Sequence, residues 1–463
     1  MYHDTIAAIA TPPGEGGLAI VRLSGPEAGR IATRIFRRGR RLRAVTLDEL
    51  DSHRLYYGAI VDPADERQLD EVMLARMRPP RTFTREEVVE ISCHGGVLPV
   101  REVLSLCLRS GARAAEPGEF TLRAFLNGRI DLSQAEAVAG VVGARTERSL
   151  ELAVDELRGR LTARLNPARD ALVELMAYLD AAADFPDDEI PGIELDPALE
   201  QARTALSDVL AGARSGLLYR EGVQVAIVGR PNVGKSSLLN ALLGSERAIV
   251  TEIAGTTRDV IAETINLRGL PVTLLDTAGI TQTENVVERI GVERSRQALA
   301  ASGIVLFVID GSQSLQKGDH EVAALLRERL SGEGVVVAVN KADLPAVHDG
   351  ELRSLADPRW PAVSISTHTS HGLPELTAVL HEQIVGRSES AAEPALVTIR
   401  QLDALRRALG AVEDAQAARL AAVPLDLLAV DVRTALYAVG EITGEHISEA
   451  VLDEIFSRFC IGK

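Results

Sequence analysis

Apolar residues follow two different patterns outside the middle of the chain. Residues 1–118 mix short β-like runs, such as Leu18–Leu23 and Val88–Ser92, with glycine and proline punctuation and helix-like spacing, which is typical of a small α/β unit. Residues 119–219 and 386–463 are rich in Ala, Leu, Glu and Arg at helical spacing. These two segments are predicted to be helical.

Between the helical segments, residues 220–385 alternate apolar runs with helical stretches. The runs are Val223–Val228, Val272–Leu275, Ile304–Ile309 and Val335–Val339. This alternation predicts a doubly wound, mainly parallel sheet. Because the helical flanks look alike and neither carries an obvious complete core, we expect one helical domain interrupted by an inserted α/β domain. Two separate helical bundles would fit the same pattern.

Composition indicates a globular protein of the cytoplasm. The chain has 463 residues, 46% of them apolar, which is enough for two or three domains. We find no run of the ~18 apolar residues that a membrane span needs, and the N-terminus does not resemble a signal peptide. Three cysteines, Cys93, Cys107 and Cys460, are too few and too scattered for a disulfide framework or a zinc site, as expected in a reducing compartment.

The charge balance disfavours a protein that coats itself with nucleic acid, since the formal net charge is −16. A contact with phosphates would have to be local. One basic cluster offers such a contact; its members are Arg34, Arg37, Arg38, Arg40, Arg41 and Arg43. Composition alone favours a solvated, flexible charge run over a binding surface.

The strongest motif is a phosphate-binding loop between the predicted strand Val223–Val228 and a predicted helix. It reads Gly229-Arg-Pro-Asn-Val-Gly-Lys-Ser236. Glycines let backbone N–H groups and the helix N-terminus face phosphates, while Lys235 reaches the β- and γ-phosphates and Ser236 binds Mg²⁺. The residues predicted to contact nucleotide here are Asn232, Val233, Gly234, Lys235, Ser236 and Ser237.

Two further motifs follow later strands in the order that a GTPase requires. Asp276-Thr277-Ala278-Gly279 can hold the Mg²⁺ water shell and sense the γ-phosphate. Asn340-Lys341-Ala342-Asp343 selects the base, because a carboxylate at 343 accepts both edge donors of guanine and adenine lacks that pair. Ser366 and Thr367 lie where the loop that backs the guanine is expected.

Two features differ from a Ras-like switch. Ile280 occupies the position of the usual water-orienting Gln, so another group must orient the hydrolytic water. The loop at 251–259 is rich in hydroxyls and carbonyls, and Thr257 is expected to complete the Mg²⁺ shell. The remaining oxygens of this loop could bind a second, monovalent cation. Alternatively, the segment is simply a flexible switch loop. The predicted nucleotide contacts in this loop are Thr251, Glu252, Ile253, Ala254, Gly255, Thr256 and Thr257.

Several specific stretches together resemble the MnmE (TrmE) family of bacterial tRNA-modification GTPases over essentially the full chain. They are residues 4–17, His94-Gly-Gly96, 117–127, 131–136, Gly255-Thr-Thr-Arg-Asp259, Val287-Glu-Arg-Ile-Gly291 and the terminal Phe459-Cys-Ile-Gly-Lys463. The resemblance implies four segments: a folate-binding and dimerisation domain (1–118), a helical domain in two parts (119–219 and 386–463) and a G domain (220–385).

The resemblance also implies cofactors, partners and residue roles. It implies a homodimer that works with the flavoprotein MnmG on carbon 5 of the wobble uridine of certain tRNAs, using a one-carbon tetrahydrofolate. Folate contacts then fall on Arg22, Glu90, Arg129 and Lys463. Potassium ligands fall on Asn232, Thr251, Ile253 and Thr256. Glu288 becomes the catalytic acid that orients water.

The tail and the overall function leave alternatives open. The resemblance places the tail with Cys460 in the modification centre, but a lone cysteine there is also typical of a small apolar residue, and thiol reactivity does not follow from it. A GTPase switch in ribosome assembly or RNA binding would share the G motifs, although it should carry a basic RNA-binding module. A third hypothesis is a regulatory or scaffold protein that binds GTP without hydrolysing it.

Overall fold

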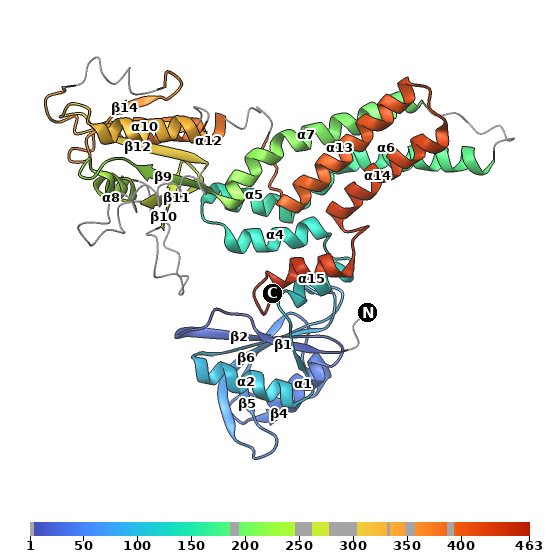
Figure 1. Cartoon of the computed structure of the whole chain (residues 1–463). Helices are drawn as coiled ribbons and strands as arrows, with labels where there is room; N and C mark the ends of the chain where they lie inside the picture. The colour runs from blue at the N-terminus through green and yellow to red at the C-terminus, as the bar shows by residue number, and fades with distance from the viewer. Residues whose placement is uncertain are drawn as a thin grey trace. The chain divides into compact units, whose positions relative to one another are not determined.

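The computed structural model describes residues 4–185, 194–245, 262–276, 303–330, 334–347, 357–386 and 393–463. These residues form two compact units. The first contains residues up to 139 together with 157–162 and 436–463, and the second contains 140–156 with 163–435. Each unit is described by itself (Figure 1). Among the helices of the described ranges, none is long and apolar enough to cross a membrane.

In the first unit, eight of the described strands form one sheet in the order β4-β3-β5-β6-β7-β2-β1-β8. Neighbouring strands are antiparallel except β1 and β8, which are parallel. The elements are β1 (Ile6–Ile9), β2 (Gly16–Ser24), α1 (Ala28–Ile35), β3 (Phe36–Arg38), β4 (Arg43–Ala44), η1 (Leu47–Glu49), β5 (Arg54–Val61), β6 (Gln68–Met77), β7 (Val88–Gly95), α2 (Val97–Arg109), β8 (Arg113–Ala114), α3 (Glu119–Leu126), α4 (Leu132–Gly143) and α15 (Glu449–Ser457).

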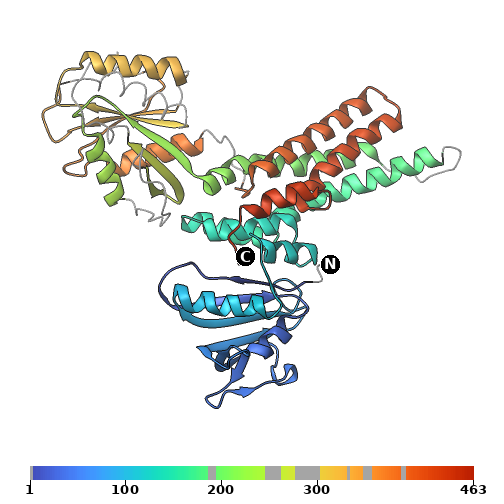
Figure 2. The ribbon, with the colours of Figure 1, turned by 60° about the horizontal axis from the view of Figure 1, so that its bottom comes forward.

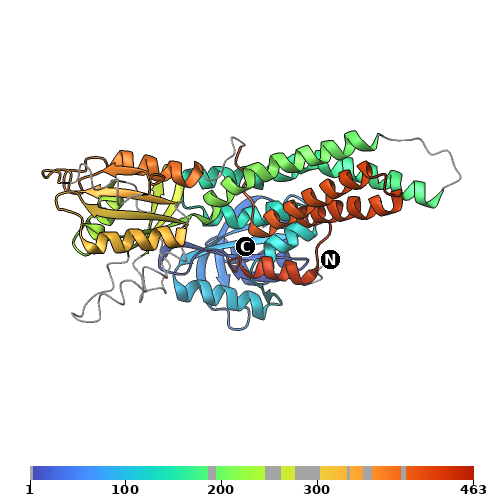
Figure 3. The same cartoon turned by 45° about the horizontal axis from the view of Figure 1, so that its top comes forward.

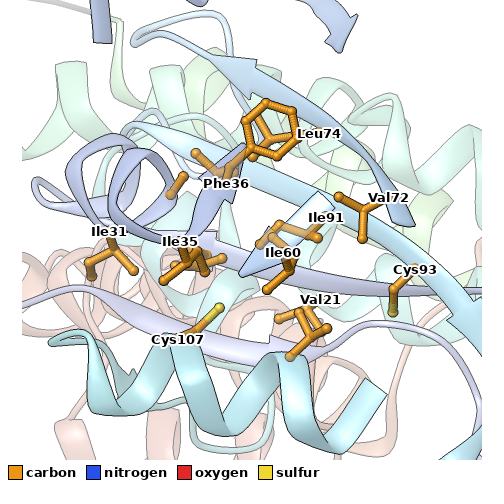
Figure 4. Close-up of a cluster of buried hydrophobic side chains, with 14 of the residues drawn as sticks. Val21, Ile31, Ile35, Phe36, Ile60, Val72, Leu74, Ile91, Cys93 and Cys107 are labelled. Atoms are coloured by element: carbon orange, nitrogen blue, oxygen red, sulfur yellow. The ribbon is translucent and has the colours of Figure 1, made fainter. Parts of the chain in front are cut away.

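The core of this sheet lies under α1 and α2. Alternate residues of β2, Val21 and Leu23, are fully buried, as expected for a strand with one covered face. Figure 4 shows Val21 among aliphatic side chains from neighbouring strands and helices. Cys93 and Cys107 belong to this core, and burial raises the pKa of their thiols to about 11 and about 12. All three cysteines are free.

A buried arginine joins α3 to the start of the chain. Arg123 is fully buried and donates to Asp4 Oδ1 at 2.7 Å and to Glu119 Oε1 at 2.9 Å. Glu86 is a third acidic partner at 3.3 Å. Buried charges are stable only when paired and hydrogen-bonded, so this cluster fixes α3 against the sheet. Phe456 of α15 packs closely against Gly118, which precedes α3. A Cβ on Gly118 would collide with the carbonyl oxygen of Phe456.

The second unit contains a six-stranded sheet in the order β10-β11-β9-β12-β13-β14. Only β10 is antiparallel to its neighbour, which confirms the mainly parallel, doubly wound prediction. One face is covered by α8 and α12 and the other by α10 (Figure 2). The elements are β9 (Val223–Val228), α8 (Lys235–Ser245), β10 (Ala262–Leu267), β11 (Leu270–Asp276), β12 (Ile304–Asp310), α10 (Lys317–Leu330), β13 (Val335–Asn340), β14 (Ala362–Ser364) and α12 (Leu373–Val385).

Helices from before and after the G segment pack together, as predicted for an interrupted helical domain. The helix α7 (Leu195–Glu221) lies beside α13 (Ile399–Leu420) along much of its length (Figures 1 and 3). Where the chain returns from the G segment to the helices, its backbone near Ala395 packs against Gly212 and Gly216 of α7. This close contact is possible because glycine has no side chain. The remaining helices are α5 (Glu147–Leu157), α6 (Arg160–Asp184) and α14 (Leu425–Thr443).

Candidate functional site

The phosphate-binding loop lies between the central strand β9 and α8, where the sequence motif predicted it. Asn232 adopts a left-handed conformation with φ 66°, and Gly234 has φ 100°. A side chain on Gly234 would collide with the Asn340 amide, so glycine is required by space as well as by conformation. Asparagine tolerates this left-handed region better than most non-glycine residues do.

Two side chains brace this loop from within. Lys235 is 8% exposed, and its Nζ donates to the carbonyl oxygens of Gly229 at 2.9 Å and Arg230 at 2.8 Å. Asn340, which ends β13, donates through Nδ2 to the Val233 carbonyl at 2.9 Å. Ser236 and Ser237 are exposed in the first turn of α8. The loop is therefore preformed, with its lysine curled back over the turn.

The loops after β13 and β14 meet at a second part of the site. Ser366 donates to Asp343 Oδ1 at 2.6 Å, and Thr367 N donates to Asn340 Oδ1 at 3.2 Å. The Ser366 hydrogen bond lowers the pKa of Asp343, which keeps this exposed carboxylate ionised. Ala342 and Asp343 line an open hollow of about 560 Å³ together with residues 369–371. A charged acceptor facing such a hollow suits a ligand with paired N–H donors.

Asp310 joins the candidate site through Lys341, although the sequence motifs did not point to it. It ends β12, is 3% exposed, and accepts from Lys341 Nζ at 2.6 Å. Burial alone would raise the pKa of Asp310, but hydrogen bonds from Lys341 and Ser312 outweigh it and lower the pKa. The pair fixes the Lys341 side chain of the Asn-Lys-Ala-Asp motif to the end of β12. A carboxylate directly after the apolar run Ile304–Ile309 was the signal, because ligands bind at the carboxyl ends of parallel strands.

Arg230 is a second residue that the sequence did not single out. Its guanidinium pairs with Asp319, whose side chain is 1% exposed, at 2.9 Å, and it donates to Gln316 Oε1 at 2.6 Å. Asp319 lies in the first turn of α10. The ion pair therefore fastens the phosphate-binding loop to α10, since Arg230 and Asp319 are 89 positions apart in the chain. Sequence alone offers no signal for this pairing.

Part of the predicted site lies outside the described residues. Asp276 lies within the described residues and ends β11. The predicted residues that lie outside the described ranges are Thr251, Glu252, Ile253, Ala254, Gly255, Thr256, Thr257, Thr277, Ala278, Gly279 and Glu288.

The first unit brings most of the predicted folate contacts together. Arg22 on β2 lies directly across from Glu90 on β7 and pairs with it at 2.8 Å. Arg22 Nη1 also donates to the Gly462 carbonyl at 3.2 Å, which fixes the C-terminal tail against the sheet. Its guanidinium lies 5.7 Å from the Phe120 ring centroid. A cation, a carboxylate and an aromatic face thus share one location.

The remaining predicted residues of this region lie near that location. Arg129 is exposed, lies 4.8 Å from the centroid of the Phe83 ring, and Phe83 packs on the same small cluster as Phe120. Burial, followed by repulsion from Arg85, lowers the pKa of Arg129. Cys460 is exposed, and its carbonyl accepts from Gly118 N at 3.4 Å. Lys463 is half-buried.

The fold and the nucleotide site together define the class of protein. A phosphate-binding loop follows the central strand β9, an Asn-Lys-Ala-Asp motif follows β13 two strands away, and its carboxylate faces an open hollow. This arrangement is that of a P-loop GTPase.

Comparison with known proteins identifies the family within that class. Residues 5–129 match the model "GTP-binding protein TrmE N-terminus" and residues 132–460 match "MnmE helical domain". Proteins named tRNA modification GTPase MnmE are 48% identical in Heliobacterium modesticaldum and 47% identical in Geobacter metallireducens, each over 100% of both chains. The chain belongs to the tRNA modification GTPase MnmE family. The G domain of T. maritima FeoB is 28% identical over 35% of this chain and 97% of its own, with a TM-score of 0.27.

Proposed function

We propose that this chain is a potassium-dependent GTP hydrolase that acts with the flavoprotein MnmG on carbon 5 of the wobble uridine of certain tRNAs, using a one-carbon tetrahydrofolate. Family membership supports a GTPase with a role in tRNA modification. The observation that carries the nucleotide part is the Ser366–Asp343 pair at 2.6 Å. It presents an ionised acceptor to the open hollow, where guanine would donate both of its edge N–H groups.

Each side chain of the described nucleotide site has a role in this proposal. Lys235, now bonded to two loop carbonyls, would transfer its donors to the β- and γ-phosphates. The N-terminus of α8 adds a positive partial charge. Arg230, held by Asp319, keeps the loop in position. Preorganised donors of this kind stabilise the charge that develops on the transferred phosphoryl group.

The residue types in these motifs suit the proposed cations. Hydroxyl and carboxylate oxygens suit Mg²⁺, and we assign it to Ser236 and Thr257, with Asp276 holding its water shell. We assign K⁺ to Asn232, Thr251, Ile253 and Thr256. Asn232 lies in the phosphate-binding loop with a left-handed backbone, which asparagine tolerates, and its exposed side chain carries an amide oxygen that can serve as a ligand. When bound, the cations would neutralise the negative charge of the phosphates. Glu288 would orient the attacking water.

The folate proposal rests on the first unit. Arg22 and Lys463 offer cations for the folate carboxylates, Glu90 offers an acceptor for ring N–H donors, and the partly buried Phe83 offers an aromatic face. The domain assignment goes with it: folate binding and dimerisation in 1–118, helices in 119–219 and 386–463, and GTP hydrolysis in 220–385.

The proposal is tested by nucleoside analysis of tRNA from a strain that lacks this protein, together with GTP turnover in potassium and in sodium. We expect the modified wobble uridine to disappear and turnover to need potassium, since a cation in the role of an arginine finger is worth about three orders of magnitude. Asn232→Ala should remove the cation preference. Intact modified uridine in the null strain, or equal turnover in both salts, would contradict the corresponding part.

A further inference from the structure

The basic cluster of the sequence forms the outer edge of the first unit's sheet. Residues 34–43, here named the arginine hairpin, comprise the end of α1, β3, a tight turn at Gly39 with φ 67°, and β4. Arg37 lies across from Ala44 and Arg38 across from Arg43. The strand β4 ends the sheet order and is labelled at the lower edge in Figure 1. The cluster is therefore a folded hairpin with five of its six arginines exposed.

The charges of this hairpin are only partly matched by acids. Arg43 pairs with Glu49 at 2.7 Å. Arg34 and Arg37 donate instead to backbone carbonyls, which leaves their charge unneutralised. For Arg40 and Arg41 the described residues provide no acidic partner within ion-pair distance. The whole chain has a formal net charge of −16. The arginine hairpin is therefore a local positive region on a negatively charged protein.

Part of the hairpin is also held in a fixed orientation. The guanidinium of Arg38 lies 4.7 Å from the centroid of the Tyr56 ring on β5. Gly39 N donates to the Tyr57 carbonyl at 2.9 Å, which ties the turn to the sheet. Stacked, oriented guanidinium groups lose less freedom on binding phosphate than lysines on a mobile tail.

We propose that the arginine hairpin binds the phosphate backbone of the tRNA substrate. The inference rests on the proposed tRNA modification and adds a location for the RNA. Phosphate contacts position a nucleic acid without reading its sequence, and arginine is suited to them by its forked donors. A membrane surface fits less well, because insertion needs exposed apolar side chains and Leu42, 39% exposed, is the only large one within the hairpin.

The experiment compares R40Q/R41Q with the wild-type full-length chain, using an unmodified tRNA transcript as the probe over a range of salt concentration. The matched control is R203Q/R419Q, which removes two arginines that are paired with Glu200 and Asp196 in the second unit. We expect R40Q/R41Q to weaken tRNA binding and to lower the slope of log affinity against log salt by about two, because each arginine bound to a phosphate adds about one to that slope. The control should leave the slope unchanged.

Two results would overturn the proposal. An unchanged slope in R40Q/R41Q would overturn the proposal and leave the hairpin as a solvated edge. Loss of binding to phosphatidylglycerol vesicles, with tRNA binding intact, would also overturn it in favour of a membrane. GTP turnover should stay at the wild-type level in R40Q/R41Q. Failure of the proposed function would show instead as normal wobble uridine in the null strain, whatever the hairpin binds.

Discussion

Asp343 is an exposed carboxylate with one oxygen already engaged by Ser366. We predict that Asp343→Asn lowers GTP affinity by up to about a hundredfold, because the amide can no longer accept both guanine donors and the loss of one hydrogen bond to a charged group costs about 1.5–3 kcal/mol. Xanthine nucleotide should gain affinity, since the amide N–H₂ can donate to the xanthine carbonyl. The measurement is the dissociation constant of GTP and of XTP, side by side.

The control for this prediction removes the same charge from the same unit. Asp357 is paired with Arg359 and does not line the hollow beside Asp343. Asp357→Asn should leave both affinities near wild type. If Asp343→Asn binds GTP as well as the wild type does, another residue selects the base and the assignment of the hollow is wrong.

At the scale of secondary-structure elements, α3 depends on the buried Arg123 cluster. We predict that Arg123→Leu destabilises the first unit by about 3–5 kcal/mol, because it leaves buried carboxylates without their cation. Arg54→Leu is the control: its pair with Asp51 is largely exposed, and such pairs contribute about 0–1 kcal/mol. Unfolding is followed by circular dichroism. A loss no larger than that of the control would show that Arg113 compensates for Arg123.

The single tryptophan of the chain makes this measurement specific. Trp360 is 4% exposed in the core of the second unit, so its fluorescence reports unfolding of that unit. In Arg123→Leu the fluorescence transition should stay where it is in the wild type while an earlier transition appears by circular dichroism. Equal shifts in both signals would mean that the two units unfold together.

The same cluster predicts how stability changes with pH. Burial raises the pKa of Asp4 and of Glu119, but pairing with Arg113 and Arg123 outweighs burial and lowers both. A carboxyl group with a lowered folded pKa stabilises the fold above its unfolded value and loses that contribution as pH falls through the folded value. The wild type should therefore lose stability below about pH 4.5. In Arg123→Leu this dependence should be weaker.

The sequence predicted the elements better than the contacts between them. Strands such as β9 and β12 were visible as apolar runs, because a buried parallel strand is apolar on both faces. The Arg230–Asp319 pair and the close approach of the chain at Gly216 could not be predicted, since they join segments far apart in sequence. The order of the sheet strands also depends on such long-range pairing.

At the scale of the whole molecule, family resemblance supplied what residue patterns could not. Phosphate and guanine motifs are local, so they were found from spacing and physical chemistry alone. The predicted folate contacts are not local: Arg22 and Gly462 meet although they are separated by 440 positions. Only resemblance pointed to that meeting of the N-terminal sheet and the tail.

The C-terminal tail, residues 460–463, is predicted to be needed for tRNA modification but not for GTP hydrolysis. The described hydrogen bonds of the tail, from Gly118 to Cys460 and from Arg22 to Gly462, stay within the first unit. The nucleotide site is built within the second. Deleting residues 460–463 should therefore abolish tRNA modification while GTP hydrolysis continues near the wild-type rate. Modification is scored by the wobble uridine in a null strain, and hydrolysis by phosphate release.

A Cys460→Ser variant distinguishes thiol chemistry from packing of the tail. Cys460 is exposed, and serine nearly preserves its shape while being a far weaker nucleophile than a thiolate. If the thiol reacts, Cys460→Ser should lose modification as fully as the deletion does. If the tail only completes the folate site, the serine variant should keep most of its activity. A deletion variant that still restores the modified uridine would remove the tail from the modification centre, and one that stops hydrolysing GTP would show that the two activities are not separable.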